Sequence, residues 1–197
     1  MLLKKKICVF CGSSKGNYDY YQALASNVGN LIGKYDFDFV YGAGSTGLMG
    51  TCANSAKKSG AMVYGVIPNF LTKIEQPPNN INLKITSNMR TRKALMYKLS
   101  SLFIILPGGI GTLDECVEVL TLMQLKQLKN KKILILNFKN YWDHLFKLFK
   151  KMEIEGFVKN SFSCNFIKIK SIDELENFLK SFWKKRILSY MLLIKIK

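Results

Sequence analysis

The chain has 197 residues, 48% of them hydrophobic, and its 30 Lys and Arg residues outnumber 13 Asp and Glu residues, giving a formal net charge of +17. The length suits one compact domain, the apolar fraction excludes a disordered or fibrous protein, and no segment has the roughly 20 apolar residues of a membrane-spanning helix. The apolar run at 7–10 is too short for an export signal, so we expect a cytoplasmic protein without a membrane partner.

Strands and helices are predicted to alternate along the chain. The unbroken apolar runs among the strands are typical of buried parallel strands. In chain order we expect a strand at 6–10, a helix at 18–34, a strand at 37–41, a helix at 47–59, strands at 61–67 and 83–86, and a helix at 89–99. There follow a strand at 102–106, a helix from the glycines after 107 to 129, a strand at 132–136, a helix at 142–152, a strand at 166–169 and a helix at 172–184.

This alternation predicts an α/β fold, namely a doubly wound, Rossmann-like parallel sheet with helices on both faces in a single domain. Residues 1–185 make up that domain, and residues 186–197 form a C-terminal tail whose role stays open: a helix end, a dimer contact or a disordered segment. Ligands of such folds bind beyond the carboxyl ends of the strands. The candidate sites are therefore the loops at 12–14, 42–47, 68–70 and 107–112.

Neither the charge nor the cysteines indicate a further partner. The lysines are scattered over the predicted helices and arginine occurs only at 90, 92 and 186, whereas nucleic-acid surfaces also use the fixed fork of arginine. Cys8 and Cys11 form a C-x-x-C pair, but there is no second pair and the one histidine lies far along the chain. We therefore expect no nucleic-acid partner and no metal.

The loop at 42–47 matches the pattern G-x-G-x-x-G, after a predicted strand and before a predicted helix. Three interpretations stay open: glycines for tight strand-to-helix packing, contact with a phosphate or ribose, and a nicotinamide dinucleotide site. A dinucleotide site normally follows the first strand and has an acid for the ribose about 20 residues on. This loop follows the second strand, and the first acid beyond the next strand is Glu75.

The loop at 107–112 reads Pro-Gly-Gly-Ile-Gly-Thr and precedes a predicted helix. Gly108, Gly109 and Gly111 allow successive N–H groups to converge on one anion at the helix start. Thr112 can cap this helix and also donate its hydroxyl to a phosphate. The lysine of the P-loop pattern G-x-x-x-x-G-K-[ST] is missing, which disfavours hydrolysis of a nucleoside triphosphate.

Carboxylates follow that loop along the predicted helix. Asp114 and Glu115 are expected in its first turn, where acids also complement the helix dipole. Glu115 and Glu118 share one helix face and Thr121 lies about one turn further on, an arrangement suited to the hydroxyls of a sugar. A carboxylate beside C1′ of a ribose can stabilise an oxocarbenium-like transition state or activate water.

Arg90, Arg92 and Lys93 open the helix that precedes the strand at 102–106. Cations at a helix start run against the helix dipole, which marks them as site candidates, with ordinary surface charge as the alternative. Arg90 and Arg92 lie two residues apart and cannot face the same way on a helix, so we expect only one of them in the site.

These motifs together resemble the LOG (Lonely Guy) family, long labelled possible lysine decarboxylases. The family signatures M-x-x-R-K and P-G-G-x-G-T-x-x-E are matched at 89–93 and 107–115. The segments at 11–14 and 42–50 are also similar to the first two loops of the family, with Ala43 where a glycine is usual. The resemblance covers about residues 7–181.

The resemblance implies a homodimer that hydrolyses the N-glycosidic bond of nucleoside 5′-monophosphates, such as N6-isopentenyl-AMP and AMP, to free base and ribose 5-phosphate. It implies Arg92 and Glu115 as the catalytic pair, without a cofactor. The substrate-binding residues expected by position are Ser14, Gly44, Ser45, Glu75, Met89, Lys93, Gly108, Gly109, Ile110, Gly111, Thr112, Leu113, Asp114 and Thr121.

Two other functions stay open. A lysine decarboxylase would hold pyridoxal phosphate on a Schiff-base lysine, and no motif singles out one of the many lysines. A nucleotide-binding protein without turnover would bind AMP and release no base, which the carboxylate of Glu115 makes less attractive. No residue identified from the sequence reads the edge of the base.

Overall fold

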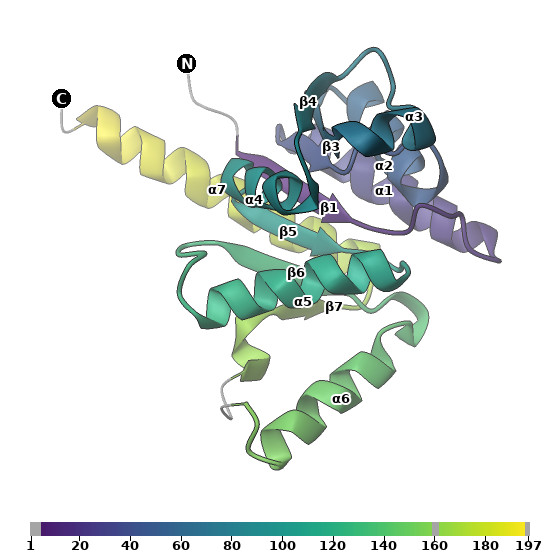
Figure 1. The fold of residues 1–197 in the computed structure, drawn as a ribbon. Coiled ribbons are helices and arrows are strands. Elements are labelled where there is room, and N and C mark those ends of the chain that lie inside the picture. The colour runs from purple at the N-terminus through teal and green to yellow at the C-terminus, as the bar shows by residue number, and fades with distance from the viewer. Residues whose placement is uncertain (1–4, 159–161, 196–197) are drawn as a thin grey trace.

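The computed structural model describes residues 5–158 and 162–195, whose strands form one seven-stranded sheet (Figure 1). All strand pairs are parallel, in the order β4-β3-β2-β1-β5-β6-β7. The doubly wound α/β fold expected from the sequence is confirmed. The strands are β1 Lys6–Phe10, β2 Asp38–Tyr41, β3 Val63–Pro68, β4 Asn82–Thr86, β5 Leu102–Ile105, β6 Lys132–Leu136 and β7 Ile167–Ile169.

Helices cover both faces of this sheet. The core under one face packs α1, α2 and α7, and the core under the other packs α4, α5 and α6. Residues of β1 alternate between the two cores, since Ile7 and Val9 enter the first and Cys8 and Phe10 the second. The helices are α1 Asp19–Lys34, α2 Gly47–Lys58, α3 Thr72–Glu75, α4 Met89–Leu99, α5 Ile110–Gln124, α6 Asp143–Ile154 and α7 Ile172–Lys195, with short 3-10 turns η1 Asn69–Leu71, η2 Phe138–Asn140 and η3 Phe162–Asn165.

The winding direction of the sheet reverses between β1 and β5. Strands β2 to β4 extend the sheet on one side of β1, and β5 to β7 extend it on the other. The loops that follow β1 and β5 are joined by a hydrogen bond from the Gly12 N–H to the Pro107 oxygen, at 3.1 Å. Because the loops diverge from such a switch point, this edge is where a doubly wound sheet binds its ligand.

Three helices differ from the expectation. Helix α5 ends at Gln124, before the expected end at 129, because the backbone becomes left-handed at Lys126 (φ 57°). Helix α7 continues past 184 to Lys195, so the expected tail extends the last helix, and 196–197 lie outside the described residues. Helix α3 was not expected, and it ends at Glu75, because the next residue, Gln76, is also left-handed (φ 42°). In the part of the chain that the structure describes, no helix is long and apolar enough to cross a bilayer.

Candidate active site

A cavity of about 270 Å³, which we call the main cavity, lies beyond the carboxyl ends of β1, β2 and β5. Its walls come from the segments that follow these strands, from α3 and α4, and from the first two turns of α5. The cavity therefore lies at the switch point of the sheet. The site residues expected from the sequence that line it are Glu75, Met89, Arg92, Gly109, Ile110, Gly111, Thr112, Asp114 and Glu115.

Backbone carbonyls hold the guanidinium of Arg92 in the main cavity. Its Nε donates to the Val66 oxygen at 3.1 Å and its Nη2 to the Gly42 oxygen at 3.2 Å, and only 8% of the residue is exposed. A Cβ atom at position 42 would lie 2.0 Å from Arg92 Nη2, so this close approach requires Gly42. Arg90 on the same helix is exposed, as expected for two arginines of which one reaches the site.

The start of α4 sets the direction of Arg92. Asn88 caps this helix, because its Oδ1 accepts from the Thr91 N–H at 3.0 Å while the Thr91 hydroxyl accepts from the Asn88 N–H at 3.2 Å. This capping box satisfies backbone donors that a helix start leaves free. Met89 is the first helical residue, and its sulfur lies 3.5 Å from Arg92 Nη1. The cap thus fixes where α4 begins and places Arg92 one helical turn after Asn88.

Glu115 lies in the second turn of α5 and lines the main cavity. Burial raises the pKa of its carboxyl from 4.5 to about 7, while the charge of Arg92 acts in the opposite direction. The sequence analysis placed Asp114 and Glu115 in the first turn, which is wrong, because α5 begins at Ile110. The carboxyl of Glu115 therefore lies beyond the helix start, with a pKa suited to proton transfer near neutral pH.

The start of α5 is built to leave room for an anion. The N–H groups of its first turn lack partners within the helix and point outward. The Cβ positions of Gly109 and Gly111 have no other protein atom within 4 Å, whereas a Cβ on Gly108 would lie 2.2 Å from Thr112 Oγ1. Gly109 is the N-cap and Thr112 is the third helical residue, so the expected cap by Thr112 is wrong. The buried Thr112 packs against Gly108 instead.

Lys93 and Glu118 do not line the main cavity. The Lys93 ammonium pairs with the Asp114 carboxylate at 3.0 Å and with the Glu118 carboxylate, and both carboxylates raise the pKa of Lys93 against its partial burial. Glu118 also accepts from the Tyr97 hydroxyl at 2.9 Å. The carboxylate of Glu118 is therefore engaged by Lys93 and Tyr97 within this chain, and its expected contact with sugar hydroxyls stays a prediction.

Two further expected residues on α5 lie outside the main cavity. Leu113 lines a shallow groove between α4 and α5, together with Lys93 and the exposed Ile110. Thr121 is exposed, and its hydroxyl donates to the Val117 oxygen of its own helix at 2.8 Å. A contact of either residue with substrate stays a prediction.

Gly44 and Ser45, in the loop at 42–47, do not line the main cavity. They lie beside Glu75, which does line it. The Ser45 hydroxyl donates to the Glu75 oxygen at 3.1 Å. A Cβ on Gly44 would lie 2.9 Å from Glu75 Oε2, so glycine leaves space for that carboxylate. Met49 of α2 lines the main cavity beside them, a residue that the sequence analysis did not select.

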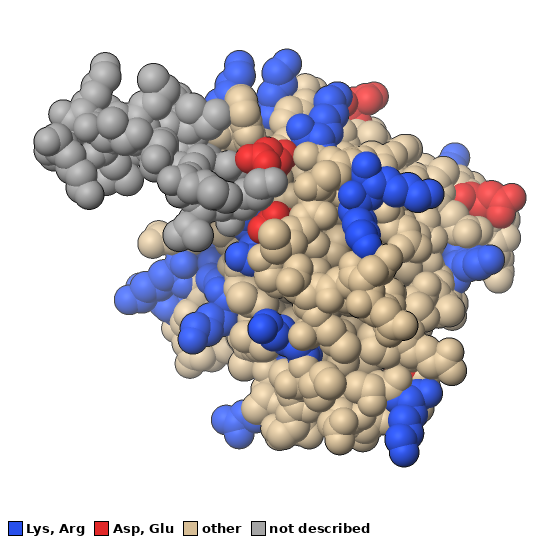
Figure 2. Space-filling model, turned by 90° about the horizontal axis from the view of Figure 1, so that it is seen from above, with Lys and Arg blue, Asp and Glu red and all other residues tan. Residues whose placement is uncertain are grey.

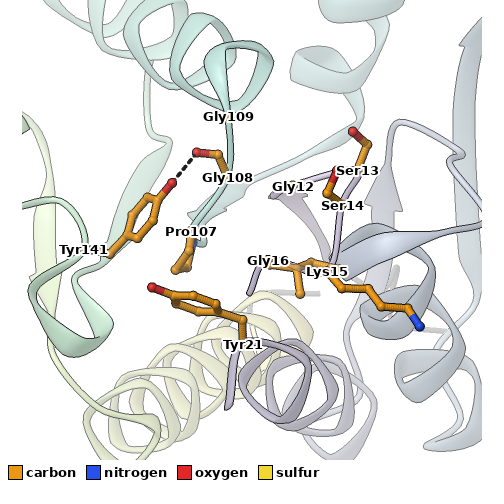
Figure 3. Close-up of a pocket in the computed structure, with 11 residues that line it drawn as sticks. Gly12, Ser13, Ser14, Lys15, Gly16, Tyr21, Pro107, Gly108, Gly109 and Tyr141 are labelled. Carbon is orange, nitrogen blue, oxygen red and sulfur yellow. Dashed lines mark hydrogen bonds between the residues drawn. The ribbon is translucent and has the colours of Figure 1, made fainter. Parts of the chain in front are cut away.

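Ser14 lines a second cavity, of about 240 Å³, that adjoins the main cavity (Figure 3). Tyr21 of α1 and Tyr141, which follows η2, form aromatic walls of this second cavity. Neither tyrosine was predicted as a site residue, because neither lies in a sequence motif; Tyr141 follows a predicted strand, which was the one available signal. The residues that line both cavities are Gly12, Ser13 and Gly109.

The C-x-x-C pair does not form a separate reactive site. Cys8 and Cys11 are buried free thiols, and burial raises the pKa of both thiols well above the ordinary value. A thiol with a raised pKa is a weak nucleophile and a weak metal ligand. Over 5–158 and 162–195, no three His, Cys, Asp or Glu residues are grouped so that they could hold a metal ion.

Comparison with known sequences identifies close relatives of this chain. The model of the family described as "Possible lysine decarboxylase" matches residues 49–180. The cytokinin riboside 5′-monophosphate phosphoribohydrolase of Rhodococcoides fascians is 39% identical over 171 residues, which cover 86% of each chain. A relative of the same enzyme name from Arabidopsis thaliana is 38% identical over 179 residues, which cover 90% of this chain and 84% of that one.

Solved structures share the fold at much lower identity. The molybdenum cofactor binding protein of Rippkaea orientalis aligns with a TM-score of 0.68 at 18% identity, over 92% of this chain and 99% of that one. The Moco carrier protein of Chlamydomonas reinhardtii aligns with a TM-score of 0.65 at the same identity and coverage. Likeness at this level of identity supports the arrangement of the sheet and helices alone.

Proposed function

The chain belongs to the possible lysine decarboxylase (LOG) family, and on that premise we propose that it hydrolyses the N-glycosidic bond of nucleoside 5′-monophosphates. The products are free base and ribose 5-phosphate. The observation that carries the proposal is the placement of Arg92 and Glu115 in one cavity with the anion-binding start of α5. The two relatives reported above are named cytokinin riboside 5′-monophosphate phosphoribohydrolases, and this name describes the same reaction.

In the proposed reaction the 5′-phosphate binds at the free N–H groups of the α5 start, with the Thr112 hydroxyl as a further donor. Arg92, which the carbonyls of Gly42 and Val66 orient, anchors or polarises the sugar-phosphate. The Glu115 carboxylate stabilises the positive charge that develops at C1′ or accepts a proton from the attacking water. The water oxygen becomes the C1′ hydroxyl, and the base leaves with the bonding electron pair and gains a proton.

The lining of the main cavity supports hydrolysis over decarboxylation. A pyridoxal phosphate enzyme needs a lysine amine within the site. In the described part of the chain no lysine lines the main cavity, Lys15 lines the adjoining second cavity, and Lys93 is paired with Asp114 and Glu118. We therefore propose a reaction that uses neither a cofactor nor a metal, and a chelator should leave the rate unchanged.

AMP and N6-isopentenyl-AMP are the proposed substrates, in a cytoplasmic homodimer that binds neither nucleic acid nor membrane. The exposed Ile110 and Val117 on α5 support a dimer contact. The Lys and Arg side chains are dispersed over the face seen in Figure 2, whereas a nucleic-acid surface would gather them into one patch. Residues 1–185 are proposed as the hydrolase domain, and 186–197 as an appended C-terminal segment.

The test is release of free base from AMP and from N6-isopentenyl-AMP, followed by chromatography. The wild-type protein should release base, and Glu115→Gln should lower the rate by about a hundredfold or more, because the variant has no ionisable group at C1′. Glu155→Gln makes the same change in an exposed carboxylate that pairs with Lys151, and it should leave the rate unchanged.

No base from either substrate, or full activity in Glu115→Gln, would overturn the proposal. Binding of AMP by the wild-type protein without any release of base would identify a nucleotide-binding protein without turnover.

A further inference from the structure

The peptide between Gly108 and Gly109 is held by a side chain from another strand connection. Tyr141 follows η2, in the connection between β6 and α6, and its hydroxyl donates to the Gly108 oxygen at 2.7 Å. Figure 3 shows Tyr141 on one side of Gly108, with Ser13 and Ser14 across the second cavity on the other side. The tyrosine thus contacts the 107–112 loop from the side away from the β1 loop.

Because a peptide group is planar, the hydrogen bond to the Gly108 oxygen also fixes the direction of the Gly109 N–H. A trans peptide is planar, with its C=O and N–H pointing in opposite directions, and the described chain has no cis peptide. The Gly108 carbonyl points at Tyr141, so the Gly109 N–H points the other way. That direction leads toward Gly12 and Ser13, where the second cavity and the main cavity meet.

The neighbouring peptides of the loop are fixed by backbone hydrogen bonds. The Pro107 oxygen accepts from the Gly12 N–H at 3.1 Å, and the Gly109 oxygen accepts from the Leu113 N–H, also at 3.1 Å, within the first turn of α5. Between them, the Gly108 oxygen accepts from a side chain. Glycines flank this peptide on both sides, and glycine gives little steric resistance to rotation. A flipped peptide would turn a carbonyl oxygen, with its partial negative charge, toward a bound anion.

The segment that carries Tyr141 is itself well anchored. The buried Asn137 accepts from the Trp142 N–H at 2.8 Å through its Oδ1 and donates to the Asp143 carboxylate at 2.7 Å through its Nδ2. The Tyr141 ring also meets the Tyr21 ring edge-on, with centroids 5.9 Å apart. Packing and hydrogen bonds on both sides of Tyr141 therefore hold its hydroxyl in place.

We propose that Tyr141 is a positioning residue for phosphate recognition, which fixes the Gly109 N–H toward the 5′-phosphate of the substrate. This inference rests on the proposed function, because it names a determinant of the same anion site. Tyr141 contacts no substrate in this role and acts through the peptide of the loop. Its loss should weaken ligands that carry a phosphate and spare ligands that lack one.

The test compares Tyr141→Phe with Tyr35→Phe, which removes a hydroxyl that donates to the Glu176 carboxylate at 3.0 Å and lines neither cavity. For Tyr141→Phe we expect KM for AMP and the inhibition constant of inorganic phosphate to rise about five- to tenfold, the effect of one hydrogen bond. The kcat value and the inhibition constant of adenosine, which has no phosphate, should stay at the wild-type level. Tyr35→Phe should change none of these values.

An unchanged KM for AMP and an unchanged phosphate constant in Tyr141→Phe would overturn the inference. An equal loss of affinity for phosphate and for adenosine would also overturn it, because a general loosening of the site would weaken both. If the wild-type protein released no base, direct titration of AMP, phosphate and adenosine by calorimetry would still test the role of Tyr141 apart from the proposed hydrolysis.

Discussion

The two glycine-rich loops of this molecule look alike in sequence and differ in what surrounds their glycines. In the loop at 42–47, a Cβ on Gly42 would lie 2.0 Å from the Arg92 guanidinium, and one on Gly47 would lie 2.1 Å from the Ser13 oxygen. In the loop at 107–112, a Cβ on Gly109 or Gly111 would meet no atom of another part of the chain within 4 Å, whereas Gly108 is packed against Thr112. The first loop is packed against protein, and two of the three glycines of the second loop face open space.

The difference shows two reasons for the same residue type. At 42–47 glycine lets parts of the protein approach one another, and the site gains a fixed arginine and a supported Glu75. At Gly109 and Gly111 the lack of a side chain leaves space for a bound ligand. Of the interpretations that the sequence left open for the first loop, the structure favours tight packing. The pattern G-x-G-x-x-G alone did not distinguish them.

The largest effect is expected from Gly42→Ala in the packed loop. The added methyl group must displace the Arg92 guanidinium, which should lower the free energy of unfolding by about 1–3 kcal/mol, as other overpacked substitutions do. Release of base from AMP should fall about a hundredfold, because a catalytic group displaced by about 1 Å loses that much. Urea denaturation and the base-release assay measure the two effects. A fully active, fully stable Gly42→Ala protein would show that the first loop is not packed as described.

A change of pH is expected to have an intermediate effect on kcat/KM, because it titrates Glu115 on the helix that follows the second loop. Burial raises the pKa of Glu115 to about 7, and both proposed roles need the ionised carboxylate, so kcat/KM should fall about tenfold per pH unit below 7. Because the folded pKa exceeds the unfolded one, the neutral form favours folding at low pH, and this stability is lost as pH rises through about 7. Glu115→Gln should therefore gain stability relative to wild type between pH 5 and pH 8. A flat difference in the free energy of unfolding between those two pH values would contradict the buried, titrating carboxyl.

The smallest effect is expected from Gly111→Ala in the open loop. No protein atom obstructs the new methyl group, and alanine is the better helix former, so the free energy of unfolding should stay unchanged or rise by up to about 1 kcal/mol. Because Gly111 lines the main cavity, the methyl group should weaken AMP binding about tenfold, the low end of the scale for one added methyl group in a binding pocket. Calorimetric titration and urea denaturation of Gly42→Ala and Gly111→Ala side by side test the comparison directly. A lower free energy of unfolding for Gly111→Ala would contradict the described difference between the two loops.

Much of the fold and part of the site could be predicted from the sequence. The apolar run at 102–106 and its counterparts identified the parallel strands, because buried strands need little beyond apolar character. The cations at the start of α4 marked Arg90, Arg92 and Lys93 as site candidates, since they oppose the helix dipole with no structural benefit of their own. Their spacing predicted that only one arginine reaches the site, and the resemblance to the LOG family selected Arg92.

The remaining errors concern rotations and long-range contacts that no local pattern encodes. Glycine at 108, 109 and 111 is compatible with several helix starts, so the choice of Gly109 as N-cap placed Glu115 one turn later than expected. The direction of Lys93 depends on how α4 rotates against α5. Tyr141 meets Gly108 across 33 residues of chain, a contact that exists only after β5 and β6 have paired.

The pairing of β1 with β5 has a further consequence for how the molecule acquires its activity. Ile7 pairs with Leu102, and the residues of β2, β3 and β4 all lie between these two residues in the sequence. Contacts of such long sequence separation form late and slowly, since a long stretch of chain must be ordered first. A partly folded intermediate that lacks this pairing has no cavity between its first and fifth strand ends. Ligand binding during refolding should therefore follow the pairing of β1 with β5, and it would report on that step.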